Sequence, residues 1–394
     1  MRLIKHKFYS TPNASKLKSY FCGIRYSNQV LEKSDDFIEG EHKEVLIVKA
    51  DSIGDYVMMR NFWEVVKSSP KYKDAKITLI LSTAMRGIAE YLDSDVIEKF
   101  FYVPHPFWKL SDREKFLVLK KLFQDGLKKQ YDTILFPSFN VSNVHSFNMM
   151  LASSIATKES IAQIGDSNPN DWGLMDRNRF FTQIVTNLDG CNQFEFTNNK
   201  LFFERACECE IDLQMHRIDL PKVLGEKYVV INPNAQDKLR NWHAQNYSRV
   251  IQYLVNKYKM KVVLVGAKSE KEVCDNLNRL TEGLCELVVG ATFKDLLGII
   301  NDAALFIGND SSCFHMAVSL QTKAICLSGG VSWHRFVNYP VSDLYRIVID
   351  EETRELLERY SNNPQNKYCS CPFVGNVNSV LYSQVKEAID ALLV

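Results

Sequence analysis

The sequence predicts an α/β protein with two Rossmann-like, doubly wound domains that face each other across a cleft, preceded by an N-terminal extension. Short apolar runs, of the length of buried strands, alternate with segments of helical periodicity. This alternation is typical of a parallel sheet covered by helices on both faces. It occurs twice, starting near residue 44 and again near residue 228, and a chain of 394 residues is long enough for two domains.

Changes in composition suggest four segments. Residues 1–44 form the extension, whose first thirty positions combine basic and aromatic side chains without an acid. Residues 45–220 form the N-terminal domain, residues 221–375 the C-terminal domain, and residues 376–394 a terminal amphipathic helix. The extension could lie on an anionic membrane surface, or it could pack on its own domain with its charges solvated.

The first alternation begins with a β-branched strand at 44–50, a turn at 51–55 and a helix at 56–67. Further segments follow in order: a strand at 77–82, a helix near 85–92, an apolar run at 100–103, a basic helix at 112–129, a strand at 133–136 and a helix near 144–155. From about 165 to 226 the alternation weakens, and Asn, Asp and Pro accumulate.

The second alternation is more regular than the first. Its expected strands lie at 228–231, 262–265, 286–289, 303–307 and 324–327, and its helices at 244–258, 270–280, 293–300 and after 312. Open sheets of this kind bind ligands at the carboxyl ends of their strands.

Composition narrows the function classes. The formal net charge of +1 argues against a nucleic-acid-binding protein. The ten cysteines show no disulfide framework. The close pairs Cys207/Cys209 and Cys369/Cys371 could ligate a metal, but a closed zinc site usually has CxxC-type spacing and four ligands. No apolar run approaches the ~20 residues of a membrane-spanning helix, and the N-terminus has no secretory h-region. We therefore expect a cytoplasmic protein without a bound metal.

The most informative stretch is residues 303–317. An apolar run ends at Gly308 and Asn309, and residues 310–312 (Asp-Ser-Ser) then offer three helix N-cap side chains in a row. A strand that turns into a helix exposes backbone N–H groups and the positive end of a dipole, which favours an anion such as phosphate. The alternative is an ordinary, well-capped turn.

Two further loops end at the same expected sheet edge. Residues 232–242 carry Lys238 and Arg240, and residues 266–270 end in Glu270. An Arg fork binds two phosphate oxygens, and an acid at a neighbouring strand end suits ribose hydroxyls. Together the three loops favour a nucleotide diphosphate, although each cation alone could be a solvated surface charge. In the first half, Asp55 follows Gly54 at a strand end and is either a functional acid or a helix cap.

Over residues 44–394 the sequence resembles glycosyltransferase family 9, the ADP-heptose:lipopolysaccharide heptosyltransferases, which have the GT-B arrangement of two Rossmann-like domains. The resemblance is carried by four segments: VLIVKADSIGD at 45–55, GATFKDLL at 290–297, GNDSSCFHMA at 308–317 and LSGGVSWHRF at 327–336. The sequence departs from the family at Arg60 and Asn61, where the family has a proline, at His243, which replaces another proline, and at Ser312, where a glycine is common.

The resemblance implies a role for each matching residue. Asp55 would be the general base, and Arg240 would stand at the position of the diphosphate-binding lysine. Glu270 would hold the ribose, and Asp310 would hold the diphosphate and sugar. The implied donor-binding set is Lys238, Arg240, Glu270, Asn309, Asp310, Ser311, Ser312 and His315. No acceptor-binding residue is assigned.

The implied activity is inverting, metal-independent transfer of heptose or a related sugar. The co-substrate would be a nucleotide-diphosphate sugar such as ADP-heptose, with no cofactor. The acceptor would be a hydroxyl of a glycolipid or oligosaccharide such as lipopolysaccharide core. Peripheral contact with the inner membrane is suggested by the basic helix at 112–129, which could also be a solvated face. His334 and Arg335 could contact phosphate or acceptor, or be solvated. A sugar-nucleotide epimerase and a non-catalytic nucleotide-sugar-binding relative are the alternatives.

Overall fold

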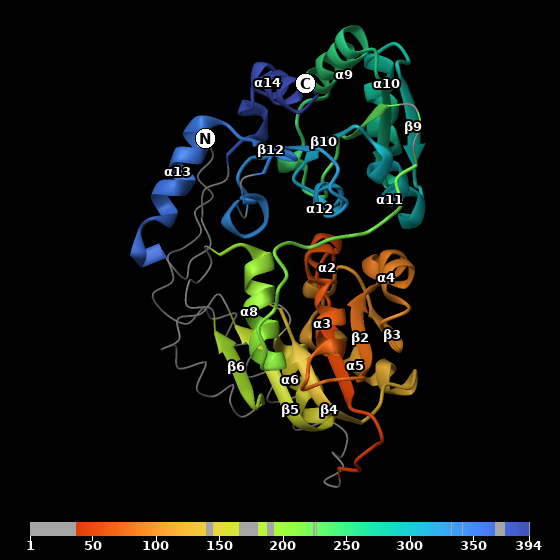
Figure 1. Ribbon diagram of the computed structural model, residues 1–394, viewed down its shortest axis with the longest axis vertical. Coiled ribbons are helices and arrows are strands. Elements are labelled where there is room, and N and C mark those ends of the chain that lie inside the picture. The colour runs from red at the N-terminus through yellow and green to blue at the C-terminus, as the bar shows by residue number, and fades with distance from the viewer. Residues whose placement is uncertain are drawn as a thin grey trace. The chain divides into compact units, whose positions relative to one another are not determined.

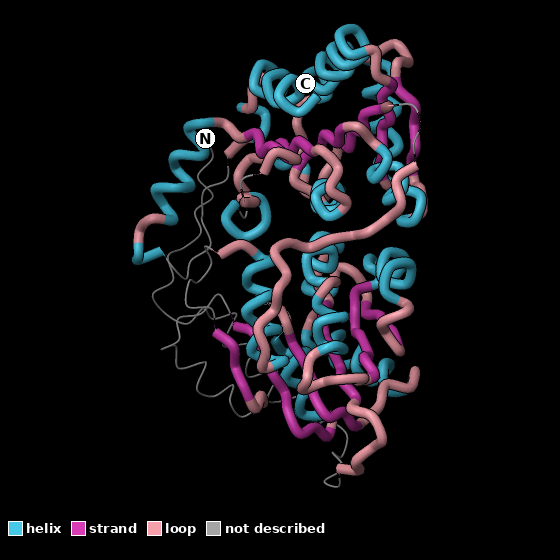
Figure 2. Tube along the Cα trace, viewed as in Figure 1, coloured by secondary structure: helices cyan, strands magenta, loops and turns pink. Residues whose placement is uncertain are grey.

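The structure, a computed structural model, describes residues 37–138, 145–164, 180–186, 193–223, 225, 227–331, 333–340, 342–366 and 375–393. The chain divides into two compact units after Gln214. Within the described residues, each unit contains a six-stranded parallel sheet flanked by helices (Figures 1 and 2). The predicted α/β fold with two doubly wound domains is confirmed. The extension up to residue 36 and the Cys369/Cys371 pair lie outside the described residues.

The sheet of the N-terminal unit has the strand order β3-β2-β1-β4-β5-β6, and every neighbouring pair is parallel. The order reverses between β1 and β4, so the carboxyl end of β1 lies at the switch point of the sheet. The strands are β1 (Glu44–Lys49), β2 (Lys76–Ser82), β3 (Lys99–Val103), β4 (Gln130–Phe136), β5 (Ala156–Ile164) and β6 (Gln183–Thr186), and the helices are α2 (Ile53–Met59), α3 (Phe62–Ser68), α4 (Arg86–Asp93), α5 (Asp112–Gln124), α6 (His145–Ser154) and α8 (Glu195–Cys207).

Apolar side chains cover both faces of this sheet. On one face, Leu119 and Leu122 of α5 and Phe147 of α6 share a buried cluster with strand residues such as Ile134. The packing of α3 against α8 is aromatic: the rings of Phe62 and Phe203 stack with centroids 4.9 Å apart. This packing fixes α8, whose first residue is Glu195.

The C-terminal unit repeats the topology with the order β12-β11-β10-β7-β8-β9, again parallel throughout. Its switch point lies between β10 and β7. The strands are β7 (Tyr228–Asn232), β8 (Lys261–Gly266), β9 (Cys285–Val289), β10 (Leu305–Asn309), β11 (Ala324–Leu327) and β12 (Tyr345–Val348), and the helices are α9 (Ala244–Tyr258), α10 (Lys271–Leu280), α11 (Phe293–Asp302), α12 (Ser312–Ser319), α13 (Glu351–Ser361) and α14 (Tyr382–Leu393).

In this unit the amphipathic helices α9 and α14 pack on one face of the sheet. Their residues Tyr247, Leu254 and Ile389 belong to a buried cluster with Ile231 and Ile307 of the central strands. Because α14 completes this core, the terminal amphipathic helix predicted from the sequence is part of the C-terminal unit.

Several elements differ from the sequence predictions. The helix predicted at 112–129 ends at Gln124, because Gly126 has a left-handed φ of 94° that stops it. The strand β5 and the helix α8 were not predicted, since both carry buried polar residues that obscure the apolar pattern. Gln163 of β5 and Asn198 of α8 are buried, and the Gln163 side chain donates to the Asn198 carbonyl at 2.9 Å. The pair β12 and α13 was also not predicted.

The helix predicted at 56–67 is divided into α2 and α3 at Arg60 and Asn61. The buried Arg60 guanidinium binds the Asp93 carboxylate at the end of α4, with Nη2 2.7 Å from Oδ1 and Nε 3.3 Å from Oδ2. The Tyr56 hydroxyl donates to the same carboxylate. The buried Arg60–Asp93 pair therefore lies at the point where the two helices meet.

We predict that Asp93→Ala destabilises the N-terminal unit by about 3–5 kcal/mol, because it leaves the Arg60 charge buried without its partner. Asp93→Asn should cost less, since an amide oxygen still accepts from Tyr56. Asp95→Ala, at an exposed neighbouring position, is the control and should stay within about 0.5 kcal/mol. Urea denaturation of the three variants measures this, and equal midpoints for Asp93→Ala and Asp95→Ala would contradict it.

Candidate functional site

Asp55 lies directly beyond the carboxyl end of β1, in the first turn of α2. Its Oδ2 accepts a hydrogen bond from the Ser52 backbone N–H at 3.3 Å, as part of a capping box. The side chain is partly exposed. Asp55 therefore caps its helix and is also open to a ligand at the switch point of the sheet.

Beneath Asp55 lies a fully buried lysine. Lys49 Nζ pairs with Asp51 Oδ2 at 2.7 Å and lies 3.9 Å from Oε1 of the buried Glu195. Burial lowers the pKa of Lys49, but the charges of Asp51, Asp55 and Glu195 outweigh this and raise it above its ordinary value. The carboxyl edge of β1 thus holds a permanent cation close to Asp55.

In the C-terminal unit, the loops after β7 and β10 begin side by side. The parallel register pairs Asn232 with Gly308, and a Cβ on Gly308 would approach the Phe306 ring to 2.9 Å and the Asn232 carbonyl oxygen to 3.1 Å. The Asn232 side chain also donates to Val265 of β8 at 3.0 Å. A glycine at 308 is therefore required for the close approach of these two strand ends.

Arg240 and Asp310 meet at this switch point. Nη1 of Arg240 is 3.1 Å from Oδ2 of Asp310, whose side chain is only 5% exposed. Burial raises the pKa of Asp310, and Arg240 opposes that shift. Nε of Arg240 is enclosed and has no hydrogen-bond acceptor among the described residues. A buried donor left unpaired costs about 1–3 kcal/mol, so an acceptor supplied by a ligand would stabilise this arrangement.

The first turn of α12 is not capped by its own serine. Ser311 is the N-cap residue, but its hydroxyl donates to Asn232 Oδ1 at 3.3 Å and makes no cap hydrogen bond. Ser311 and Ser312 are both partly exposed. The positive end of an eight-residue helix therefore lies next to the Arg240–Asp310 pair.

Asn309, which is predicted to bind the donor, has a fully buried side chain that supports the loop after β7. Its Oδ1 accepts from the Trp242 backbone N–H at 3.2 Å and from the Tyr247 hydroxyl at 3.1 Å. Its Nδ2 donates to the Pro233 carbonyl at 2.8 Å. Asn309 thereby holds both ends of the loop that carries Arg240.

Glu270 ends the short helical turn η5 (Lys268–Glu270) after β8. Its Oε2 accepts from the Ala267 backbone N–H at 2.7 Å. Burial, followed by the charge of Glu270, raises the pKa of the Cys313 thiol to about 12. Glu270 is thus close enough to act electrostatically on the first turn of α12. Lys238 lies in the turn η4 (Lys238–Arg240), and its side chain lies outside the described residues.

His315, in α12, is buried, and its Nδ1 lies 2.7 Å from the Tyr339 hydroxyl. Burial, with a contribution from the Arg240 charge, lowers its pKa to about 3. The structure therefore brings Arg240, Asp310, Ser311, Ser312 and His315 together, with Glu270 nearby. Asp55 belongs to the other unit.

Other residues that the sequence suggested as ligand contacts make hydrogen bonds or ion pairs within the protein. His334, in the π-helical turn η6 (Trp333–Val337), contacts the Ser361 hydroxyl of α13. On the basic helix α5, Lys121 pairs with Asp125 at 3.2 Å, and beyond its end Lys128 pairs with Glu44 at 2.8 Å. Among the described residues, no cluster of three or more His, Cys, Asp or Glu side chains is arranged to hold a metal, and no helix is long and apolar enough to cross a membrane.

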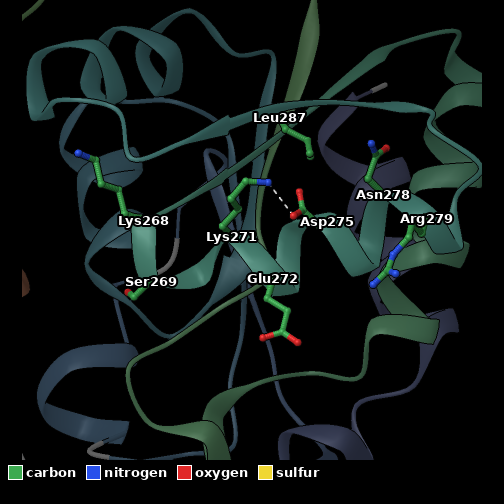
Figure 3. Close-up of a pocket in the computed structure, with 8 residues that line it drawn as sticks. All are labelled: Lys268, Ser269, Lys271, Glu272, Asp275, Asn278, Arg279 and Leu287. Carbon is green, nitrogen blue, oxygen red and sulfur yellow. Dashed lines mark hydrogen bonds and ion pairs between the residues drawn. The ribbon is translucent and has the colours of Figure 1, made fainter.

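A surface hollow of about 710 Å³ lies along α10. Figure 3 shows that its charged side chains come from η5 and α10, with Lys271 paired to Asp275. The lining residues are Lys268, Ser269, Lys271, Glu272, Asp275, Asn278, Arg279 and Leu287. Of the described donor-site residues, neither Arg240 nor Asp310 lines it, so we place the candidate site at the switch point.

Sequence reasoning missed several residues that shape the two sites. Lys49 stands inside an apolar run, and a charge within a buried strand was a usable signal. The acid that pairs with it across the fold, Glu195, carried no such signal. Tyr339 and Asn232 act through contacts between distant segments, which no local pattern reveals.

Residues 184–368 match the model of glycosyltransferase family 9 (heptosyltransferase). Among curated proteins, the chain is 28% identical over 148 residues to a lipopolysaccharide heptosyltransferase 3 of Escherichia coli, covering 35% of this chain and 43% of that protein. It is 33% identical over 111 residues to the protein of the same name from strain K12, covering 27% of this chain and 32% of the relative. The chain thus spans less than half the length of these relatives.

Comparison of the fold with solved structures finds similarity over most of the chain. A glycosyltransferase family 9 structure from Veillonella parvula aligns with a TM-score of 0.64 at 15% identity, over 91% of this chain and 99% of that one. The heptosyltransferase WaaC of Escherichia coli, solved with ADP, aligns with a TM-score of 0.65 at 15% identity, over 89% and 99%. Residues 184–368 are therefore similar to glycosyltransferase family 9, and the chain shares the two-sheet α/β fold of these structures.

Proposed function

We propose that this protein is an inverting, metal-independent glycosyltransferase of lipopolysaccharide biosynthesis. It would move heptose or a related sugar from a nucleotide-diphosphate donor, with ADP-heptose as the first candidate, to a hydroxyl of a core glycolipid or oligosaccharide. The family match and the names of the relatives support this assignment. The observation that carries it is the Arg240–Asp310 pair beside the uncapped start of α12 at the β7/β10 switch point.

The donor would bind the C-terminal unit. Its diphosphate would accept hydrogen bonds from the Arg240 guanidinium and from the backbone N–H groups at the start of α12. The Asp310 carboxylate would accept from a sugar hydroxyl. Burial raises the pKa of Asp310, and the Arg240 charge next to it opposes that shift and so favours the ionised form. Glu270, near the same helix turn, would bind the ribose.

The N-terminal unit would supply the base. Asp55 would remove the proton from the acceptor hydroxyl while that oxygen attacks the anomeric carbon and the bond to the nucleotide diphosphate breaks. The Lys49 ammonium, buried among carboxylates, favours the ionised form that a base requires.

Charge that develops on the departing diphosphate would be stabilised by Arg240 and by the dipole of α12, which are preorganised cationic groups of this chain. We propose that Lys238 adds to this stabilisation. The lipid-linked acceptor would bring a cytoplasmic protein to the inner face of the inner membrane.

We predict that Asp55→Asn lowers the rate of sugar transfer about 10²–10⁴-fold, the usual contribution of a positioned base. The amide oxygen can still accept from Ser52, so the helix cap should survive. Nucleotide-sugar binding should be unchanged. The assay is transfer from ADP-heptose to a truncated lipopolysaccharide acceptor, with donor binding measured by calorimetry.

The matched control is Asp295→Asn, because Asp295 holds the same capping position in α11 as Asp55 does in α2. Equal activity losses in the two variants would mean that Asp55 acts only as a cap. Donor binding without transfer to any acceptor by the unmodified protein would favour a non-catalytic relative. Conversion of the donor to an isomer without acceptor would favour an epimerase.

A second prediction concerns the guanidinium of Arg240. Arg240→Lys keeps the charge but loses the fork, so nucleoside diphosphate should bind about 10-fold more weakly, as expected for one charge-assisted hydrogen bond. Arg249→Lys is the control, since Arg249 is exposed and lies over the Tyr382 ring, 4.1 Å from its centroid. Unchanged binding by Arg240→Lys would contradict the placement of the diphosphate.

A further inference from the structure

A glutamate is buried near the candidate base, at the start of α8. Glu195 is the first residue of this helix, and its side chain has no exposed surface. Its Oε1 lies 3.9 Å from Nζ of Lys49, which is equally buried at the end of β1. A buried carboxylate is strongly destabilising unless a cation compensates it. Glu195 and Lys49 therefore depend on each other.

The start of α8 is held in a fixed position by several contacts. The Gln163 side chain, near the end of β5, donates to the Asn198 carbonyl at 2.9 Å. The Asn198 side chain donates to the carbonyl of Gln193, just before the helix, at 3.1 Å. Further along, α8 packs on α3 through stacked aromatic rings. A rigid helix thus presents the Glu195 carboxylate to Lys49.

The inner face of α8 changes from polar to apolar along the helix. Its buried positions in the first turns are Glu195, Asn198 and Asn199, and the next turn continues with the apolar Phe202. Polar side chains thus occupy the end of the helix that contains the contact with Lys49. Replacing a buried ion pair by apolar side chains is often neutral or stabilising, so packing alone does not require a carboxylate here.

The Lys49 ammonium has three N–H donors, and three oxygen atoms surround it. Asp51 Oδ2 lies at 2.7 Å, the Pro137 carbonyl oxygen at 3.4 Å and Glu195 Oε1 at 3.9 Å. Asp51 Oδ2 also accepts from the Ser138 hydroxyl, beyond the end of β4, at 3.3 Å. These contacts hold the ammonium at the switch point between β1 and β4.

The charges that act on Lys49 come from two directions. Asp51 and Asp55 belong to the turn after β1 and the first turn of α2, and Glu195 belongs to α8. The segment after β4 contributes a carbonyl and a hydroxyl, which carry no charge. Burial lowers the pKa of Lys49, and the three carboxylates together raise it above its ordinary value. Lys49 is therefore a cation throughout the working pH range.

The two members of the buried pair act on Asp55 in opposite directions. The Lys49 charge stabilises the carboxylate form of Asp55, and acting alone it would make Asp55 a weak base. The negative charge of Glu195 opposes that effect. We infer that Glu195 is a positioning residue that holds the Lys49 ammonium and offsets its charge, so that Asp55 is ionised and still basic enough to take the proton of the acceptor hydroxyl. The inference rests on the proposed function.

The test is the pH dependence of kcat/KM for sugar transfer, which reports the ionisation of the base in the free enzyme. Glu195→Gln keeps the shape but removes a negative charge, so the acid limb should move to lower pH by about 0.5–1 unit. The plateau should fall about 2–3-fold, because Asp55 becomes a weaker base. Lys49→Met removes a positive charge, so the acid limb should move to higher pH. A purely structural role would lower both activities without opposite shifts.

A double variant and a matched control complete the experiment. Lys49→Met combined with Glu195→Gln removes both charges together, so it avoids a buried charge that has lost its partner. Its acid limb should return to that of the unmodified protein. The control is Glu204→Gln, on the same helix, where the partly exposed carboxylate accepts from the Ile211 backbone N–H at 3.3 Å. Its acid limb should not move.

An unchanged acid limb in Glu195→Gln, or shifts in the same direction in both single variants, would overturn the inference while leaving the proposed function intact. If the single variants do not fold, a double variant whose acid limb differs from that of the unmodified protein would overturn it. A Glu195→Gln shift that persists in the residual activity of Asp55→Asn would do so too, because Glu195 would then act on another group. If the unmodified protein transfers no sugar from any nucleotide-sugar donor, the proposed function fails, and the role assigned to Glu195 fails with it.

Discussion

The parallel register of β7 and β10 is the constraint from which the candidate donor site follows. It sets Asn232 beside Gly308, so two loops with different chemistry start from one point on the sheet edge. The loop after β7 brings Arg240, and the loop after β10 brings Asp310 and the start of α12. Asn232 and Asn309 then connect the two loops through their amides. A shift of one strand by one residue would separate these partners, because successive side chains point to opposite faces.

Three basic side chains, Lys49, Arg60 and Arg240, are wholly or largely buried at a strand end, a helix break and the candidate donor site. Lys49 lies close to Asp55, and Arg60 lies at the break between α2 and α3. Each is compensated by a carboxylate within about 3 Å, as a buried ion requires. Arg240 differs, since its Nη1 is paired while its enclosed Nε has no acceptor among the described residues. Of these three cations, Arg240 is therefore the one that we expect to bind a ligand through its remaining donor.

Local sequence patterns correctly predicted the central strands, the turn at Asp55 and the closeness of the loops that carry Arg240 and Asp310. They did so because apolar runs and helix-cap residues directly indicate where strands end. They failed where buried polar residues replace apolar ones, as in β5 and α8, whose hydrogen bonds come from other elements. They also gave no sign that the Asn309 amide supports the loop that carries Arg240. The Tyr339 hydroxyl links His315 to the distant His216, and no spacing rule could have predicted this contact.

The most direct test of the account is hydrogen exchange of the backbone, followed by mass spectrometry, with and without a saturating nucleotide-diphosphate sugar such as ADP-heptose. The account predicts slower exchange in peptides that cover residues 232–242 and 309–316, where the donor would meet Arg240 and the first turn of α12. It predicts no change along α10, beside the hollow of Figure 3. Protection confined to α10, or binding without protection of either loop, would contradict it.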